Sequence, residues 1–166
     1  MMSIDRDEFI VIRTLDPVET GQELRAIPPH MTELSWFFLQ RDDLGQLIPQ
    51  IDELVDRHGF LASTAEGKKR VLYGENEDVP ACEMVVAHDK IHQGLVEAVK
   101  ALNGTYRFPD FALNWSPHIT DEHGVAVQVG QRVGFSSMAL ISRQDDESGK
   151  RKVVEHSVKL VGGIDS

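Results

Sequence analysis

The sequence contains little cysteine, no long apolar run and no excess of basic residues. Its single cysteine, Cys82, excludes an internal disulfide and a cluster of thiolate metal ligands. No segment approaches the roughly 20 consecutive apolar residues that cross a bilayer. The N-terminal segment MMSIDRDEFI carries acids where a secretory signal would carry basic residues and then an apolar stretch. We therefore expect a cytoplasmic protein without a membrane-spanning segment.

Two familiar motifs for phosphate binding or nucleophilic attack are also missing. The GQEL segment at 21–24 lacks the lysine and the second glycine of a P-loop. The sequence contains no Gly-x-Ser-x-Gly turn, which would expose a nucleophilic serine. These absences disfavour P-loop nucleotide hydrolysis and serine-hydrolase chemistry.

The charge balance limits the class of partner. The chain has 27 acidic residues against 17 Lys and Arg, and its formal net charge is −10. Proteins that bind long nucleic acids usually present a basic face, because neutralising phosphates supplies most of the non-specific affinity. We therefore expect no tight binding to extended RNA or DNA. A small nucleotide, or the end of an RNA strand, suits this surface better.

Length and periodicity predict an α+β protein. The 166 residues, of which 41% are hydrophobic, fit one domain, or two small lobes that share a core. Residues of high β-propensity predict about eight mostly antiparallel strands, the clearest at Glu8–Leu15, His30–Leu39, Phe60–Ser63, Lys69–Tyr73, Pro80–Ala87, Val133–Ser142 and Lys152–Leu160. The polar segment DDESGK at 145–150 suits a hairpin turn between the last two.

Apolar residues at helical spacing predict two main helices. The first includes Leu44 to Val55 and ends before Gly59, and the second covers Asp89–Leu102 and ends before Gly104. Pro49 interrupts the first pattern, and we expect it in the first turn of that helix, with a short turn ahead of it.

One short motif occurs twice. PPHMTEL at 28–34 resembles SPHITDE at 116–122, and each contains proline, histidine, an apolar residue and threonine in that order. Residues i and i+2 of a strand share a face, so His30 and Thr32 should project together, as should His118 and Thr120. Each half of the chain also contains one predicted helix. We therefore expect two similar lobes that face each other across a cleft.

Two such units supply the groups needed to cleave a phosphodiester without a metal. A neutral imidazole accepts the proton of the attacking hydroxyl or water, and a protonated imidazole donates a proton to the departing oxygen. Each threonine hydroxyl donates a hydrogen bond to a non-bridging phosphate oxygen. The pattern therefore predicts His30, Thr32, His118 and Thr120 as the site, and it does not assign which histidine is the acid.

On PHMTEL at 29–34 and PHIT at 117–120, the chain resembles the 2H phosphoesterase superfamily, which includes 2′-5′ RNA ligase-like proteins and cyclic nucleotide phosphodiesterases. The resemblance extends from Phe9 to Leu160. It implies a single bilobal domain over residues 1–166 with pseudo-twofold symmetry, one His-x-Thr motif per lobe, and neither metal nor other cofactor. It also implies activity on 2′,3′-cyclic phosphates, 2′-5′ linkages or cyclic oligonucleotides. One departure is the acidic Asp121-Glu122-His123 after Thr120, where family members usually have an apolar residue.

Several further residues are candidates for binding the substrate. Trp115 and Phe111 precede the second motif and could stack on a base. Four cations could hold the phosphate, although ordinary surface charge explains each of them: Arg25, Arg13, Arg107 and Lys69. Arg25 is the preferred one.

Our leading hypothesis is a monomeric, metal-independent phosphodiesterase that acts on a nucleotide or RNA-end phosphodiester. One alternative is a binding module that recognises a nucleotide in the same cleft without turnover, which the acids after Thr120 suggest. Another is a metal-dependent hydrolase using His88 and His92, whose spacing of four suits one helix face, although no third ligand is evident. A start-of-helix role explains His88 equally well, and His156 is expected to face solvent.

Overall fold

The structure, a computed structural model, describes residues 6–58, 62–73, 77–85, 90–113, 118–120, 132–146 and 149–160. Within these residues, no helix is both long enough and apolar enough to cross a bilayer.

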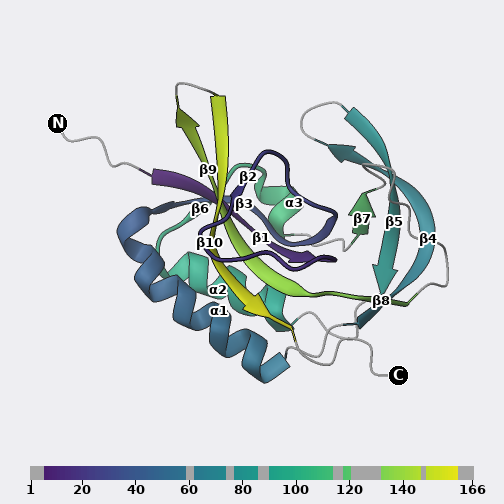
Figure 1. The fold of residues 1–166 in the computed structure, drawn as a ribbon, viewed down its shortest axis with the longest axis horizontal. Helices are drawn as coiled ribbons and strands as arrows, with labels where there is room; N and C mark the ends of the chain where they lie inside the picture. Colours follow the sequence, from purple (N-terminus) through teal and green to yellow (C-terminus); the bar gives the residue numbers. More distant parts are fainter. Residues whose placement is uncertain are drawn as a thin grey trace.

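A ten-stranded sheet forms the centre of the described structure (Figure 1). Along the sheet the order is β2-β10-β9-β1-β3-β7-β5-β4-β8, and β6 pairs with β3. The two strands that begin with the predicted histidines, β3 and β7, are therefore neighbours. The strands are β1 (Arg6–Thr14), β2 (Glu23–Leu24), β3 (His30–Gln40), β4 (Ala62–Tyr73), β5 (Glu77–Val85), β6 (Thr105–Tyr106), β7 (His118–Thr120), β8 (Arg132–Gly134), β9 (Ser137–Asp146) and β10 (Gly149–Lys159).

The helices are η1 (Arg41–Asp43), α1 (Leu44–His58), α2 (Lys90–Ala101) and α3 (Pro109–Leu113). Figure 1 shows α1 and α2 against the part of the sheet that contains β1, β3, β9 and β10, while β4, β5, β7 and β8 lie to the right. The α+β class with two main helices is confirmed, and the strand pairings of the described residues are all antiparallel.

Alternation along β1 builds a core on each face of the sheet. Phe9 and Val11 point into the larger core, which α1 and α2 cover, whereas Ile10 and Ile12 point into a smaller core on the opposite face. Because apolar residues fill both faces, β1 reads as an unbroken hydrophobic run in the sequence.

Helix α1 packs one apolar stripe against the larger core. Its buried residues, Leu44, Leu47, Ile51 and Val55, recur at spacings of three and four. Pro49 lies inside this helix, in its second turn, so the expectation that it occupies the first turn is wrong. The 3-10 turn η1 precedes α1 and extends directly into it, which is why the helix starts before the proline rather than at it.

Helix α2 ends in a Schellman motif. The amide of Gly104 donates to the carbonyl of Val99 at 2.9 Å, and that of Asn103 donates to Lys100 at 3.0 Å. The residue with positive φ is Asn103, at 58°, rather than the glycine after it. Gly104 is needed for a different reason, since an added Cβ would lie 2.5 Å from Val99 Cγ1 and 2.8 Å from Leu39 Cδ2.

Two predicted strand boundaries differ from the structure. The short strands predicted at 60–63 and 69–73 are parts of one strand, β4, because its pairing with β5 continues through the polar residues between them. Conversely, the strand predicted at Val133–Ser142 is two strands. β8 pairs with β4, and β9 pairs with β1 and β10, so the chain changes partner between them. The predicted β9–β10 hairpin is confirmed, and Gly59 lies outside the described residues.

Candidate active site

The strand register brings the two histidine motifs together. Met31 of β3 pairs with Ile119 of β7 in an antiparallel ladder. One step to either side therefore sets position 120 opposite His30 and position 118 opposite Thr32. Since residues opposite each other share a face, positions 30, 32, 118 and 120 lie on one face of the sheet, and positions 31 and 119 lie on the other.

This register fixes the spacing of the two histidine positions. Positions 30 and 118 are diagonal neighbours on the paired strands, and such positions lie roughly 7–8 Å apart. That separation allows two side chains to approach one group held between them. The second motif is also anchored on its far side, because β5 pairs with all three residues of β7.

His30 is half-buried, and its ring is oriented by the segment before it. Its Nδ1 lies 2.8 Å from the carbonyl oxygen of Pro28. A carbonyl can only accept, so Nδ1 carries the hydrogen and donates it. The neutral ring then has its lone pair on Nε2, the nitrogen that can accept or return a proton. Proline at 28 and 29 restricts the backbone of this approach, and Pro29 also accepts a hydrogen bond from the amide of Leu15 at 3.2 Å.

Arg13, considered as a phosphate ligand or a surface charge, is neither. Its side chain is 1% exposed and forms a bidentate ion pair with Glu33, whose side chain is 0% exposed. The Arg13 Nε and Nη2 atoms donate to the two carboxylate oxygens at 2.5 and 3.0 Å. This buried pair lies one residue beyond Thr32, and sequence reasoning missed Glu33 because one acid in a strand pattern gives no signal of burial.

His92 has a structural contact. It is 5% exposed on α2, and its Nδ1 donates to the backbone carbonyl of Glu33 at 2.7 Å. His88 lies outside the described residues, and within them no group of three or more His, Cys, Asp or Glu side chains is placed to hold a metal ion. His156, expected to face solvent, is 21% exposed and contacts Asp52 Oδ1 of α1 through Nε2 at 2.6 Å.

The other predicted binding residues are less closely tied to the motif. Arg25 is exposed and follows β2, which pairs with β10, so in strand order β10, β9 and β1 lie between β2 and β3. Phe111 belongs to the short helix α3, and Lys69 belongs to β4. Trp115 and the segment 121–123 lie outside the described residues. The roles of these residues stay predictions.

Arg107 contributes to an ion-pair network at the opposite end of β3. Arg107 and Arg143 both donate to the buried Glu8, Arg143 through Nη2 at 2.6 Å. Burial raises the pKa of Glu8, but the hydrogen bonds from the two arginines outweigh it, so the pKa lies below its usual value. This network borders a depression of about 500 Å³ whose arginines are largely matched by acids, and it positions strands rather than a phosphate near His30.

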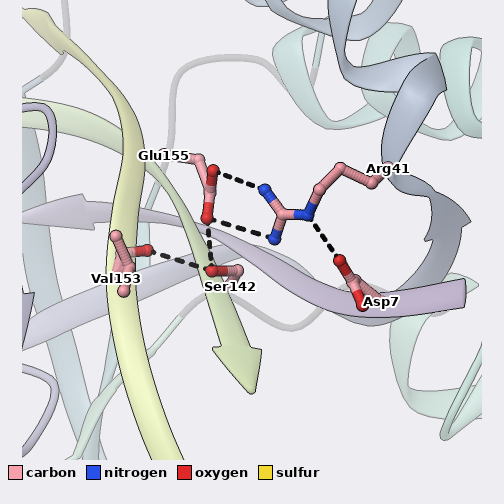
Figure 2. Close-up of polar contacts among 5 residues, drawn as sticks. All are labelled: Asp7, Arg41, Ser142, Val153 and Glu155. Atoms are coloured by element: carbon pink, nitrogen blue, oxygen red, sulfur yellow. Dashed lines mark hydrogen bonds and ion pairs between the residues drawn. The ribbon is translucent and has the colours of Figure 1, made fainter.

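A neighbouring network has the same character (Figure 2). Arg41 donates to Asp7 at 2.6 Å and to Glu155 at 2.9 and 3.3 Å, and the Ser142 hydroxyl donates to Glu155 at 2.6 Å. The network joins the residue after β3 to β1 and β10. It is a second ion-pair cluster of the same sheet, far along β3 from the histidine motif.

A groove of about 690 Å³ lies nearer the motif, beside the start of β9 and the end of β10. Thr14 pairs with both His30 and Ser137, so the groove begins two strands from His30. Its lining in the described part of the chain includes one cation, Lys159, and one acid, Glu19. With no excess of positive charge, its lining does not identify it as a phosphate site.

Comparisons with known proteins support the fold. No family model and no curated protein matches the sequence. A crystal structure of a phosphoesterase matches 93% of this chain and 98% of its own, with a TM-score of 0.53 and 14% identity. TT0787 of Thermus thermophilus matches 92% of this chain and 97% of its own, with a TM-score of 0.52 and 16% identity. E. coli LigT complexed with 3′-AMP matches 94% and 99%, with a TM-score of 0.51 and 15% identity.

The chain therefore has the α+β fold of a phosphoesterase, and over nearly its whole length. More narrowly, the fold is that of LigT-like proteins, so the resemblance to the 2H phosphoesterase superfamily that the two motifs indicate is confirmed at the level of the fold.

Proposed function

We propose that this protein is a metal-independent phosphodiesterase that cleaves a nucleotide or RNA-end phosphodiester through His30, Thr32, His118 and Thr120. The substrate is a 2′,3′-cyclic phosphate, a 2′-5′ linkage or a cyclic oligonucleotide. The observation that supports the proposal is the Met31–Ile119 pairing, which gives all four positions one face of the sheet. Two independent His-x-Thr units have no structural need to occupy adjacent strands in matching register.

The proposed reaction divides proton transfer between the two imidazoles. One, neutral, takes a proton from the attacking water as its oxygen forms a bond to phosphorus. The other, protonated, gives its proton to the ribose oxygen as the phosphorus–oxygen bond to that oxygen breaks. For His30 the transfer uses Nε2, because Nδ1 donates to Pro28. The two threonine hydroxyls donate to the non-bridging oxygens, where negative charge increases.

Replacing either histidine tests the proposal directly. His30→Ala and His118→Ala should each lower turnover of a 2′,3′-cyclic nucleotide by about 100- to 10,000-fold, the usual contribution of acid–base assistance. His156→Gln is the matched control, because His156 contacts α1 and not the motif strands, and it should retain activity. Turnover is measured by separating product nucleotides, first with small nucleotides, the class that LigT binds in its complexes with 3′-AMP and NADP⁺.

Two other outcomes would redirect the assignment. Activity should survive EDTA, and loss of turnover that zinc restores would favour a metal-dependent hydrolase instead. If nucleotides bind and both alanine variants weaken binding, but no product forms with any of the three substrate classes, the cleft serves recognition without catalysis.

A further inference from the structure

Strand β3 contains a bulge directly after the first motif. On β1, Ile12 pairs with Thr32 and Val11 pairs with Leu34, so Glu33 has no partner on β1. A bulge of this kind inserts one extra residue into a strand and changes which face the following side chains occupy. It therefore determines how the motif is oriented relative to the rest of β3.

The motif depends on this change of face. His30, Thr32 and Leu34 are each two residues apart, and regular alternation would give all of them the same face. Yet Leu34 is fully buried in the larger core together with Met31, which regular alternation would point the other way. Without the bulge, burying Leu34 would turn His30 and Thr32 into the core beneath the helices.

A buried ion pair occupies this position. Arg13 pairs in the ladder with Met31, between the two motif residues, and its guanidinium holds the carboxylate of Glu33. Both side chains are on the helix-covered face, where the Arg13 guanidinium also lies 5.9 Å from the centre of the Phe135 ring. A buried ion pair rarely stabilises a fold more than apolar side chains of similar volume would, so its presence calls for another role.

The backbone of the bulge is held as well. The carbonyl of Glu33 accepts the Nδ1 hydrogen of the buried His92 at 2.7 Å. Helix α2 thus fixes the main chain of the same residue whose side chain Arg13 fixes. Three elements, β1, β3 and α2, converge on the residue that follows Thr32.

We propose that Arg13 and Glu33, supported by His92, are positioning residues that maintain the bulge and so keep His30 and Thr32 on the site face. They act through the strand and do not contact the substrate. The catalytic part of this inference rests on the proposed function, whereas the orientation of the motif can be measured independently of it.

The test replaces the pair by apolar residues of similar size, Arg13→Met/Glu33→Leu. The double variant avoids the uncompensated buried charge that either single apolar variant would leave. Its thermal stability should be close to that of the wild type, while kcat falls about 100-fold, the cost of misplacing a catalytic group by about 1 Å, and KM changes much less. NMR should show loss of the Thr32–Ile12 cross-strand contacts and of the hydrogen-bonded His30 ring proton.

The matched control is Arg41→Met/Glu155→Leu, which removes the ion pair shown in Figure 2 from the other end of the sheet. It should leave kcat and both NMR signals unchanged. If the Arg13/Glu33 double variant does not fold, Arg13→Lys keeps the charge but loses the bidentate geometry. It should lower kcat with little loss of stability.

Unchanged kcat and intact cross-strand contacts in a folded Arg13/Glu33 variant would overturn the inference. If the wild type cleaves none of the substrates, the proposed function fails, but the NMR contacts still decide whether the pair orients the motif.

Discussion

At the scale of single residues, hydrogen-bond direction defines what the first histidine can do. The contact from His30 Nδ1 to the carbonyl of Pro28 selects one tautomer, and the prolines at 28 and 29 hold that carbonyl on a restricted backbone. This feature could be suspected from the sequence, because two prolines precede the histidine. The burial of Glu33 could not, since burial depends on Arg13 of another strand.

The lowered pKa of Glu8 makes stability depend on pH. A carboxyl whose pKa is lower in the folded than in the unfolded state adds stability above its unfolded value, and that contribution is lost as pH falls through the folded value. The ordinary value is 4.5, so the free energy of unfolding should decrease as pH drops below about 5. Glu155, whose pKa is also lowered because hydrogen bonds from Arg41 and Ser142 outweigh its burial, contributes in the same direction.

Glu8→Gln should therefore be less stable than the wild type by about 1–3 kcal/mol at pH 7, the usual cost of losing charged hydrogen bonds in a buried place. The difference should shrink as pH falls below 4.5, where the wild-type carboxyl also becomes protonated. Urea unfolding at several pH values between neutral and acidic measures this. A difference that stays constant with pH would show that the charge of Glu8 is not responsible, and Glu19→Gln, at an exposed position, controls for general effects of removing an acid.

At the scale of elements, periodicity predicted what local pattern can specify. The two main helices and the β9–β10 hairpin were predicted because their apolar spacing and polar turn are local signals. The bulge at Glu33 was not predicted, because it follows from the need to bury Leu34 while exposing the motif. Likewise, the division between β8 and β9 follows from their different partner strands.

The packing of α1 against α2 gives a test at this scale. A Cβ on Gly94 of α2 would lie 2.4 Å from Leu54 Cδ2, 2.9 Å from Cδ1 and 3.2 Å from Cγ. The whole end of the leucine would have to move, so Gly94→Ala should lower the free energy of unfolding by about 1–3 kcal/mol despite its better helix propensity. Gly45→Ala on α1 is the matched control, since nothing lies within 4 Å of the added Cβ.

The control variant Gly45→Ala should raise the free energy of unfolding by about 0.4–1 kcal/mol. Both values come from urea denaturation. Equal effects of the two substitutions would contradict the close α1–α2 contact.

At the scale of the whole molecule, the strand order explains how two distant segments form one site. Eighty-eight residues separate the histidines in the sequence, yet β3 and β7 are neighbours because the chain completes β4, β5 and α2 before it returns to the middle of the sheet. The repeated motif predicted this meeting, whereas the register that aligns Met31 with Ile119 could only come from the structure. The acidic net charge of −10 favours small phosphate esters over long nucleic acids.

The most direct test of the central claim is an NMR titration of the two histidine rings with 3′-AMP, observed through their ring nitrogens. If His30 and His118 share one phosphate, both rings should shift together with a single dissociation constant, and Thr32 and position 118 should give cross-strand contacts. Separate dissociation constants, a response from only one ring, or absence of those cross-strand contacts would contradict the account.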